Sequence, residues 1–122
     1  MPRIQIPCPQ RVRRISGSFA WLDHRVLREG HLAKLSRDEI ALYTFLVLAS
    51  DCHGVSYYGA QKICDHLAGM GLEAFLHARN RLIEAGLIGF QPFRHGDLNG
   101  FYQVLSVEER ENNDDGAGCE DK

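Results

Sequence analysis

The sequence lacks any apolar run long enough to cross a membrane. Its longest mostly apolar stretch, Ile40 to Ala49, is about half of the roughly 20 residues that a membrane-spanning helix needs. The first residues, Met1-Pro2-Arg3, are not followed by the apolar segment of a secretory signal. We therefore expect a cytoplasmic chain without membrane contact. Its 122 residues are enough for one hydrophobic core and short for two ordinary domains.

Recognisable catalytic and metal-binding patterns are also missing. No glycine-rich phosphate loop occurs, and no Ser or Cys lies in the sequence context of a known nucleophile. Cys52-His53 and Cys64-Asp65-His66 contain metal-ligating residue types. Their spacing is not that of a structural zinc site, in which two ligands share one turn. We expect no enzyme activity, no cofactor and no bound metal.

Net charge is low, but the charges are unevenly distributed along the chain. The formal net charge is −2, with 44% hydrophobic and 25% charged residues, which is typical of a globular protein. Residues 108–122 carry seven acidic and two basic side chains, whereas residues 1–107 carry nine acidic and twelve basic ones. We therefore expect a basic irregular arm at 1–17, a mildly basic body that suits a polyanionic partner, and an acidic disordered tail at 108–122.

Residues 18–107 contain the periodic segments of a single domain. The first segments predict a short strand at Ser18–Leu22 and a helix over 23–30, for which Asp23 is the expected N-cap. The large apolar residues of this part are Trp21, Leu22, Val26 and Leu27. This apolar patch fits two alternatives, a homodimer contact through residues 18–34 or packing against the chain's own core.

The clearest helix signal is a capping box at the start of the next segment. The side chain of Ser36 can accept a hydrogen bond from the backbone of Glu39, and the side chain of Glu39 can accept one from the backbone of Ser36. The helix that follows, from Arg37 to about Ser50, is apolar on nearly every side. We therefore expect it at the centre of the core and covered all round.

The remaining segments predict an α+β fold that is mainly helical. They are a strand at Val55–Tyr58, helices at Ala60–Ala68 and Leu72–Ala85, and strands at Leu87–Phe93 and Phe101–Val107. Gly86 is placed to end the second of these helices in a left-handed conformation. Pro92 cannot donate a hydrogen bond to a neighbouring strand, so its strand is expected at an edge of the sheet.

The order helix, strand, helix, tight turn, helix and two-stranded hairpin resembles the winged helix-turn-helix family. The most specific match is the stretch Arg81 to Ile88, in which a leucine, three further residues and Gly-Leu-Ile lead from a helix into a strand. The segment before this stretch is similar to the N-terminal domains of plasmid replication initiators and DnaD-like primosomal proteins. The residues that carry this similarity are Phe19, Trp21, Leu35-Ser36 and Leu42-Tyr43. The resemblance implies a three-helix helix-turn-helix core with a two-stranded β wing, preceded by a short strand and helix.

In the winged-helix family the third helix usually enters the major groove of DNA, and the wing contacts the backbone or the minor groove. Carried over by position, this implies that helix 72–85 reads double-stranded DNA. The implied contact residues are His77, Asn80 and Arg81 on that helix, Lys62, Arg94 and His95 on neighbouring elements, and Arg13 and Arg14 of the arm. Glu73 and Glu84 share the outer face of the helix and weaken its attraction for phosphate.

The resemblance therefore leads to two functional hypotheses. The first is a DNA-binding protein, a transcriptional regulator or replication-associated factor of a bacterium, phage or mobile element. The alternative is a winged-helix module that binds another protein and has little affinity for DNA. The basic arm and body favour the first hypothesis. The nearly neutral outer face of helix 72–85 and the acidic tail favour the alternative.

Overall fold

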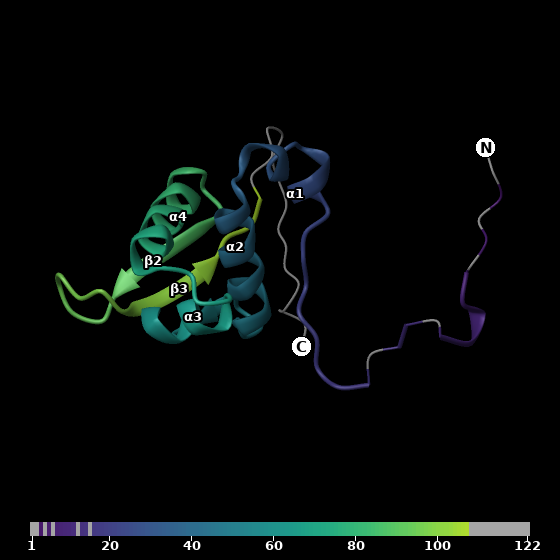
Figure 1. Ribbon diagram of the computed structural model, residues 1–122, viewed down its shortest axis with the longest axis horizontal. Coiled ribbons are helices and arrows are strands. Elements are labelled where there is room, and N and C mark those ends of the chain that lie inside the picture. Colours follow the sequence, from purple (N-terminus) through teal and green to yellow (C-terminus); the bar gives the residue numbers. More distant parts are fainter. Residues whose placement is uncertain (1–2, 4, 6, 12, 15, 108–122) are drawn as a thin grey trace.

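A computed structural model describes residues 3, 5, 7–11, 13–14 and 16–107, and the acidic tail predicted at 108–122 lies outside the described residues. In chain order the elements are a 3₁₀ turn η1 (Pro9–Arg11), helix α1 (Arg25–Arg28), a 3₁₀ turn η2 (Leu32–Lys34), helix α2 (Arg37–Ala49), strand β1 (Val55–Ser56), helices α3 (Ala60–His66) and α4 (Leu72–Glu84), and strands β2 (Ile88–Pro92) and β3 (Gly100–Val104). The α+β class, with more helix than strand, is confirmed. Figure 1 shows the loop between β2 and β3 projecting from the body.

The three strands form one antiparallel sheet in the order β1-β3-β2. β2 and β3 pair from Ile88 opposite Val104 to Pro92 opposite Gly100. The two-residue strand β1 pairs with the other side of β3, so the sheet joins the segment before α3 to the hairpin after α4. β2 lies at an edge, as predicted from Pro92. Gly100 is required for close pairing there, because a Cβ at this position would collide with the carbonyl oxygen of Gln91.

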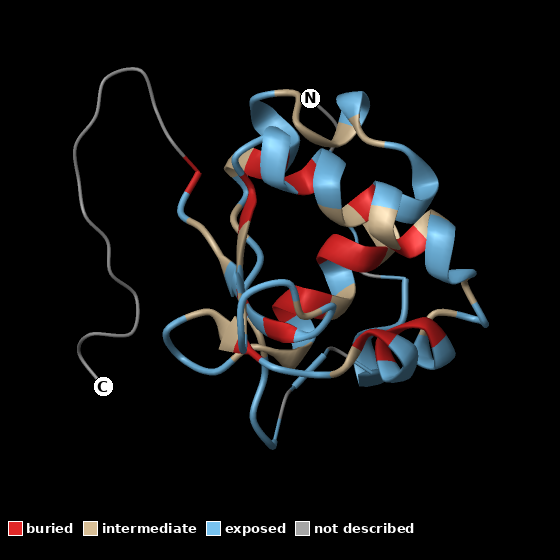
Figure 2. Cartoon of the chain, turned by 90° about the vertical axis from the view of Figure 1, so that its left-hand side faces the viewer, coloured by how far each residue is buried: buried red, intermediate tan, exposed pale blue. Residues whose placement is uncertain are grey.

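The core lies between the helices and one face of the sheet, and Figure 2 shows buried positions on the inward sides of the helices. Its largest fully buried side chains are Leu42, Leu46, Ile63, Cys64, Phe75, Leu82, Leu87, Ile88 and Tyr102. Phe75, Ala78 and Leu82 are spaced three and four residues apart, so they share one side of α4, and all three are buried. Since a fully buried large apolar side chain contributes about 1.5 to 3 kcal/mol, these residues supply most of the driving force for folding.

Two predicted helix ends are confirmed by their hydrogen bonds. At the start of α2 the N–H of Glu39 donates to Ser36 Oγ at 3.2 Å, and the N–H of Ser36 donates to Glu39 Oε1 at 3.1 Å. At the end of α4, Gly86 has a φ of +76°, and the N–H of Leu87 donates to the carbonyl oxygen of Leu82 at 3.1 Å. This left-handed ending turns the chain directly into β2.

The N-terminal part of the domain differs from the prediction. Residues 18–22 pair with no strand in the described chain, so the strand expected there is wrong. The helix expected over 23–30 is reduced to the single turn α1, because Gly30 adopts a φ of +82° and ends it. The N-cap of α1 is His24 and not the predicted Asp23, but Asp23 Oδ1 accepts a hydrogen bond from the N–H of Arg25 in the first turn at 2.8 Å.

The later elements are present with shifted ends. β1 stops at Ser56 instead of Tyr58, because its pairing with β3 covers only two residues. α3 stops at His66 instead of Ala68, which adopts a left-handed φ of +59° in the turn before α4. β2 and β3 are likewise shorter than the strands expected at 87–93 and 101–107.

α2 is central but is not covered all round, so that part of the prediction is wrong. Leu42, Tyr43, Leu46 and Val47 are buried. Leu48 is 68% exposed, and Phe45 is only half-buried. The reason is size: α4 and the sheet pack against one side of α2, and a domain this small has too few elements to enclose the other side.

Candidate nucleic-acid interface

The outer face of α4 is polar and exposed. Its exposed polar residues are Glu73, His77, Asn80, Arg81 and Glu84, all of which the helical spacing predicted to point outward. His77 and Asn80 make no hydrogen bond or ion pair within the described chain, so their side chains are available to a ligand. The fixed charges on this face are two carboxylates and one guanidinium. The face therefore offers hydrogen-bonding groups more than positive charge.

Arg81 is held between two carboxylates. Its Nε lies 3.6 Å from Glu39 Oε2, and its Nη1 lies 3.4 Å from Glu84 Oε1. Glu39 is buried at the first turn of α2, whereas the Arg81 side chain is half-exposed. A guanidinium that contacts a base must leave these partners, so Arg81 is less available than its neighbours Asn80 and His77. The pair also joins α4 to the start of α2.

The β2–β3 loop, residues 93–99, supplies two further candidate contacts. Arg94 is 87% exposed at its side chain, with its Nε 3.8 Å from Asp97 Oδ2. The same carboxylate accepts a hydrogen bond from the backbone N–H of Arg94 at 3.1 Å and closes the turn. His95 is exposed next to it. Because an ion pair this exposed is weak, the Arg94 guanidinium can exchange Asp97 for a phosphate.

Arg79 anchors this loop to α4. Its Nη1 donates to the carbonyl oxygen of Leu98 at 3.0 Å and to the hydroxyl of Tyr102 at 3.2 Å. Its guanidinium carbon lies 4.2 Å from the centre of the Phe90 ring, a cation–π distance. Burial raises the pKa of Tyr102, so its hydroxyl stays neutral and accepts from Arg79. Arg79 thus positions the loop, a role that residue type alone did not reveal.

Asn99 anchors the other end of the loop to α3. Its Oδ1 accepts a hydrogen bond from the backbone N–H of Ala60, the first residue of α3, at 2.8 Å. Gly59 occupies the N-cap position of this helix and has no side chain with which to cap it. Asn99 therefore replaces a local cap from 39 residues away in the sequence. No local pattern could have predicted this contact.

The other candidate basic residues lie on α3 and on the N-terminal arm. Lys62 is exposed on α3, and Arg13 and Arg14 are exposed on the N-terminal arm. In Figure 1 the arm runs away from the body, on the side opposite to α4. The structure thus groups His77, Asn80 and Arg81 on one helix and leaves the arm's arginines apart from them.

The apolar patch predicted at the N-terminal end of the domain divides into two parts. Val26 is buried in the core at 2% exposure. Trp21, Leu22 and Leu27 are more than half exposed, as is the nearby Phe19. Packing against the chain's own core therefore accounts for Val26 alone. The other three predicted residues, Trp21, Leu22 and Leu27, form an apolar surface in contact with solvent.

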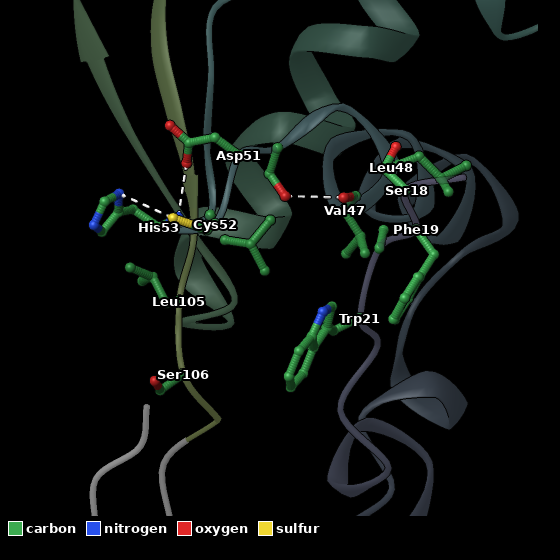
Figure 3. A pocket seen from close by; sticks show the side chains of 14 residues that line it. Ser18, Phe19, Trp21, Val47, Leu48, Asp51, Cys52, His53, Leu105 and Ser106 are labelled. Carbon is green, nitrogen blue, oxygen red and sulfur yellow. Dashed lines mark hydrogen bonds between the residues drawn. The ribbon is translucent and has the colours of Figure 1, made fainter. Parts of the chain in front are cut away.

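A cavity of about 620 Å³ lies between this segment and the end of the sheet. Figure 3 shows Phe19 and Trp21 on one side of it and Cys52, His53 and Leu105 on the other. Cys52 Sγ is 3.6 Å from His53 Nδ1. Across the described ranges, no three His, Cys, Asp or Glu side chains come together in a way that could hold a metal ion.

No family model, curated protein sequence or solved structure matches this chain. Within the described part of the chain, every helix is too short or too polar to span a bilayer.

Proposed function

We propose that this chain is a cytoplasmic winged helix-turn-helix protein that binds double-stranded DNA. It acts as a transcriptional regulator or replication-associated factor of a bacterium, phage or mobile element. The observation that carries the proposal is the exposed polar face of α4, beside a β hairpin that Arg79 and Asn99 hold against α4 and α3. A rigid helix next to a projecting hairpin is the arrangement with which winged-helix proteins enter DNA.

In this proposal α4 enters the major groove and the β2–β3 loop serves as the wing. The amide of Asn80 pairs with an adenine edge, and the imidazole of His77 donates to a base or a phosphate. Arg81 reads guanine after exchanging its carboxylate partners for the base. Phosphate contacts beside α4 come from Arg94 and His95 of the wing and Lys62 of α3, and Arg13 and Arg14 of the arm contact phosphates away from α4.

A second candidate function is a winged-helix module that binds another protein. The observation that favours it is the charge of the α4 face, where Glu73 and Glu84 outnumber Arg81. Such a face attracts DNA less strongly than one rich in lysine and arginine. The same module would use the exposed α4 surface and show no salt-sensitive affinity for DNA.

Titration of fluorescent duplex DNA into the full chain at about 50 and 200 mM salt distinguishes the two functions. A DNA binder weakens as salt rises, because its phosphate contacts release counterions. Absence of binding to any duplex at the lower salt concentration would contradict the proposal and favour the protein-binding module.

Selection of bound duplexes from a random pool then supplies a preferred site for the variant Asn80→Ala. We expect this change to cost about 1 to 3 kcal/mol of binding free energy on the preferred site and little on random DNA. An equal loss on both would show that Asn80 contacts the backbone and does not read sequence.

A further inference from the structure

Three exposed aromatic rings form a row across the outer face of the sheet. Phe101 is on β3, Phe93 directly follows β2, and Tyr57 directly follows β1. The ring centres of Phe93 and Phe101 are 5.0 Å apart, and those of Phe101 and Tyr57 are 6.2 Å apart. Tyr57 is 68% exposed, Phe93 49% and Phe101 45%. Each ring touches its neighbour edge to face and leaves much of its own surface in water.

The row is separate from both the core and the α4 surface. Successive side chains of a strand point to opposite faces of a sheet, and Tyr102, next to Phe101, points into the core. Arg79 of α4 contacts Tyr102 and Phe90 on that inner face. The helices therefore cover the inner face, and the aromatic row lies on the opposite one. Neither folding nor the proposed major-groove contact accounts for it.

The strands that carry the row are uncharged, and a guanidinium lies at one end of it. The three strands contain no charged residue, and the exposed amides of Gln91 and Gln103 flank Phe101. Arg94 follows Phe93 at the loop end, with its guanidinium mostly in solvent. Asp97 Oδ2 lies 3.8 Å from the Arg94 Nε. Because an ion pair this exposed is weak, a phosphate can replace Asp97 as the partner of Arg94.

We propose that this outer face binds single-stranded DNA by stacking unpaired bases on Tyr57, Phe101 and Phe93. Every base has a flat π face, so such a row accepts bases with little regard to sequence. Gln91 and Gln103 reach the base edges, and Arg94 meets a phosphate at the end of the row. Bases inside a duplex are already stacked and cannot enter. The stacking rings are thus separate from the duplex contact proposed for α4, and Arg94 is the one residue that takes part in both.

The test is fluorescence anisotropy of a labelled oligothymidine of about twenty nucleotides with the full chain at about 50 mM salt. We expect Phe101→Ala and Tyr57→Ala each to weaken binding about tenfold, which is the effect of losing one stacked base. Tyr57→Phe keeps the ring and should bind as the unchanged protein does. The matched control is Tyr58→Ala, because Tyr58 is adjacent but contacts Phe45 and His66 on another side of the domain.

Phe101→Leu separates stacking from apolar contact, since leucine retains bulk without a ring. Loss of binding equal to that of Phe101→Ala supports stacking. If Phe101→Leu binds oligothymidine as well as the unchanged chain does, stacking is overturned. The proposal is also overturned if both alanine variants bind as the unchanged chain does, or if the unchanged chain does not bind oligothymidine. Melting temperatures establish that each variant is folded. His77→Ala and Asn80→Ala should leave oligothymidine binding intact, so failure of the duplex proposal and failure of this one are distinguishable.

Discussion

At the scale of single residues, two serine hydroxyls have opposite environments. Ser36 Oγ accepts the N–H of Glu39 at the start of α2. Ser56 is 4% exposed in β1, and its Oγ has no hydrogen-bond partner within the described chain. A hydroxyl that caps a helix stabilises the fold, whereas one that is buried without a partner costs desolvation free energy.

Replacing each serine by alanine tests this difference. We expect Ser36→Ala to lower the free energy of unfolding by about 1 kcal/mol, because one backbone N–H of α2 loses its acceptor. Ser56→Ala should leave that free energy unchanged or raise it. Urea unfolding followed by far-UV circular dichroism measures both. Equal losses in the two variants would contradict the assignment of distinct roles.

The carboxylate of Asp51 makes stability depend on pH. Its Oδ1 accepts hydrogen bonds from the backbone N–H of Val55 at 3.0 Å and of His53 at 2.8 Å. The bond from Val55 is the main cause that holds the pKa of Asp51 below its usual value near 3.8. The unfolded chain therefore takes up the proton first on acidification. The stabilisation is complete above the unfolded pKa and is lost as pH falls through the folded one.

We expect the free energy of unfolding of Asp51→Asn to fall less steeply between about pH 5 and pH 2 than that of the unchanged chain. The amide oxygen still accepts the two backbone hydrogen bonds but does not titrate in this range. Urea unfolding at a series of pH values measures the slope. Identical slopes for the two proteins would show that Asp51 does not contribute to the acid dependence.

At the scale of elements, the β2–β3 hairpin depends on side chains from other parts of the chain for its position. Arg79 reaches it from α4, and Asn99 reaches from it to α3. Within the loop, backbone hydrogen bonds run from the N–H of Phe93 to the carbonyl oxygen of Asn99 and from the N–H of Asp97 to that of Arg94, and neither joins the loop to a helix. The projecting loop is therefore oriented by tertiary contacts.

Arg79→Met should release this loop. Methionine preserves the apolar stem but leaves the Leu98 carbonyl and the Tyr102 hydroxyl without their donor, which should cost about 1 to 3 kcal/mol of unfolding free energy. Amide hydrogen exchange of residues 93–99 should also become faster than in the unchanged chain. Lys62→Met on exposed α3 is the control for loss of a cationic side chain. Unaltered exchange in Arg79→Met would argue against the anchor.

At the scale of the whole molecule, three surfaces lie on different elements. They are the polar face of α4, the aromatic row on the outer face of the sheet, and the apolar surface formed by Phe19, Trp21, Leu22 and Leu27. We propose that the last of these is the homodimer contact through residues 18–34, because most large apolar side chains in a monomer are covered. A dimer would present two copies of α4 to one DNA duplex.

Trp21 reports on this dimer because it is the only tryptophan of the chain. It is 66% exposed in the single chain, so we expect its emission to shift to shorter wavelength as protein concentration rises and the dimer forms. Leu27→Asp should abolish the shift and halve the mass measured by sedimentation. Leu72→Asp, an equally apolar exposed position on α4, should not. A concentration-independent spectrum with a monomeric mass would exclude this contact.

Features whose partners are close in sequence could be predicted before the structure. The capping box at Ser36 and the left-handed end at Gly86 depend on partners within a few residues, and the inward side of α4 follows from its helical spacing. The structure confirms all three. The segments with the weakest local signals, residues 18–22 and 23–30, were predicted with more regular structure than they have. Their conformation depends on which part of the core they meet.

The helices after residue 36, the hairpin and the polar outer face of α4 follow from local sequence, because backbone hydrogen bonding and side-chain periodicity act over short distances. The way in which these parts join depends on contacts between residues that are distant in sequence. Arg79 meets a carbonyl 19 residues away, Asn99 caps a helix 39 residues away, and Glu39 draws Arg81 to the start of α2. Tyr57, Phe93 and Phe101 form a row only because β3 lies between β1 and β2. Contacts between distant residues depend on how the chain packs, which no local pattern specifies.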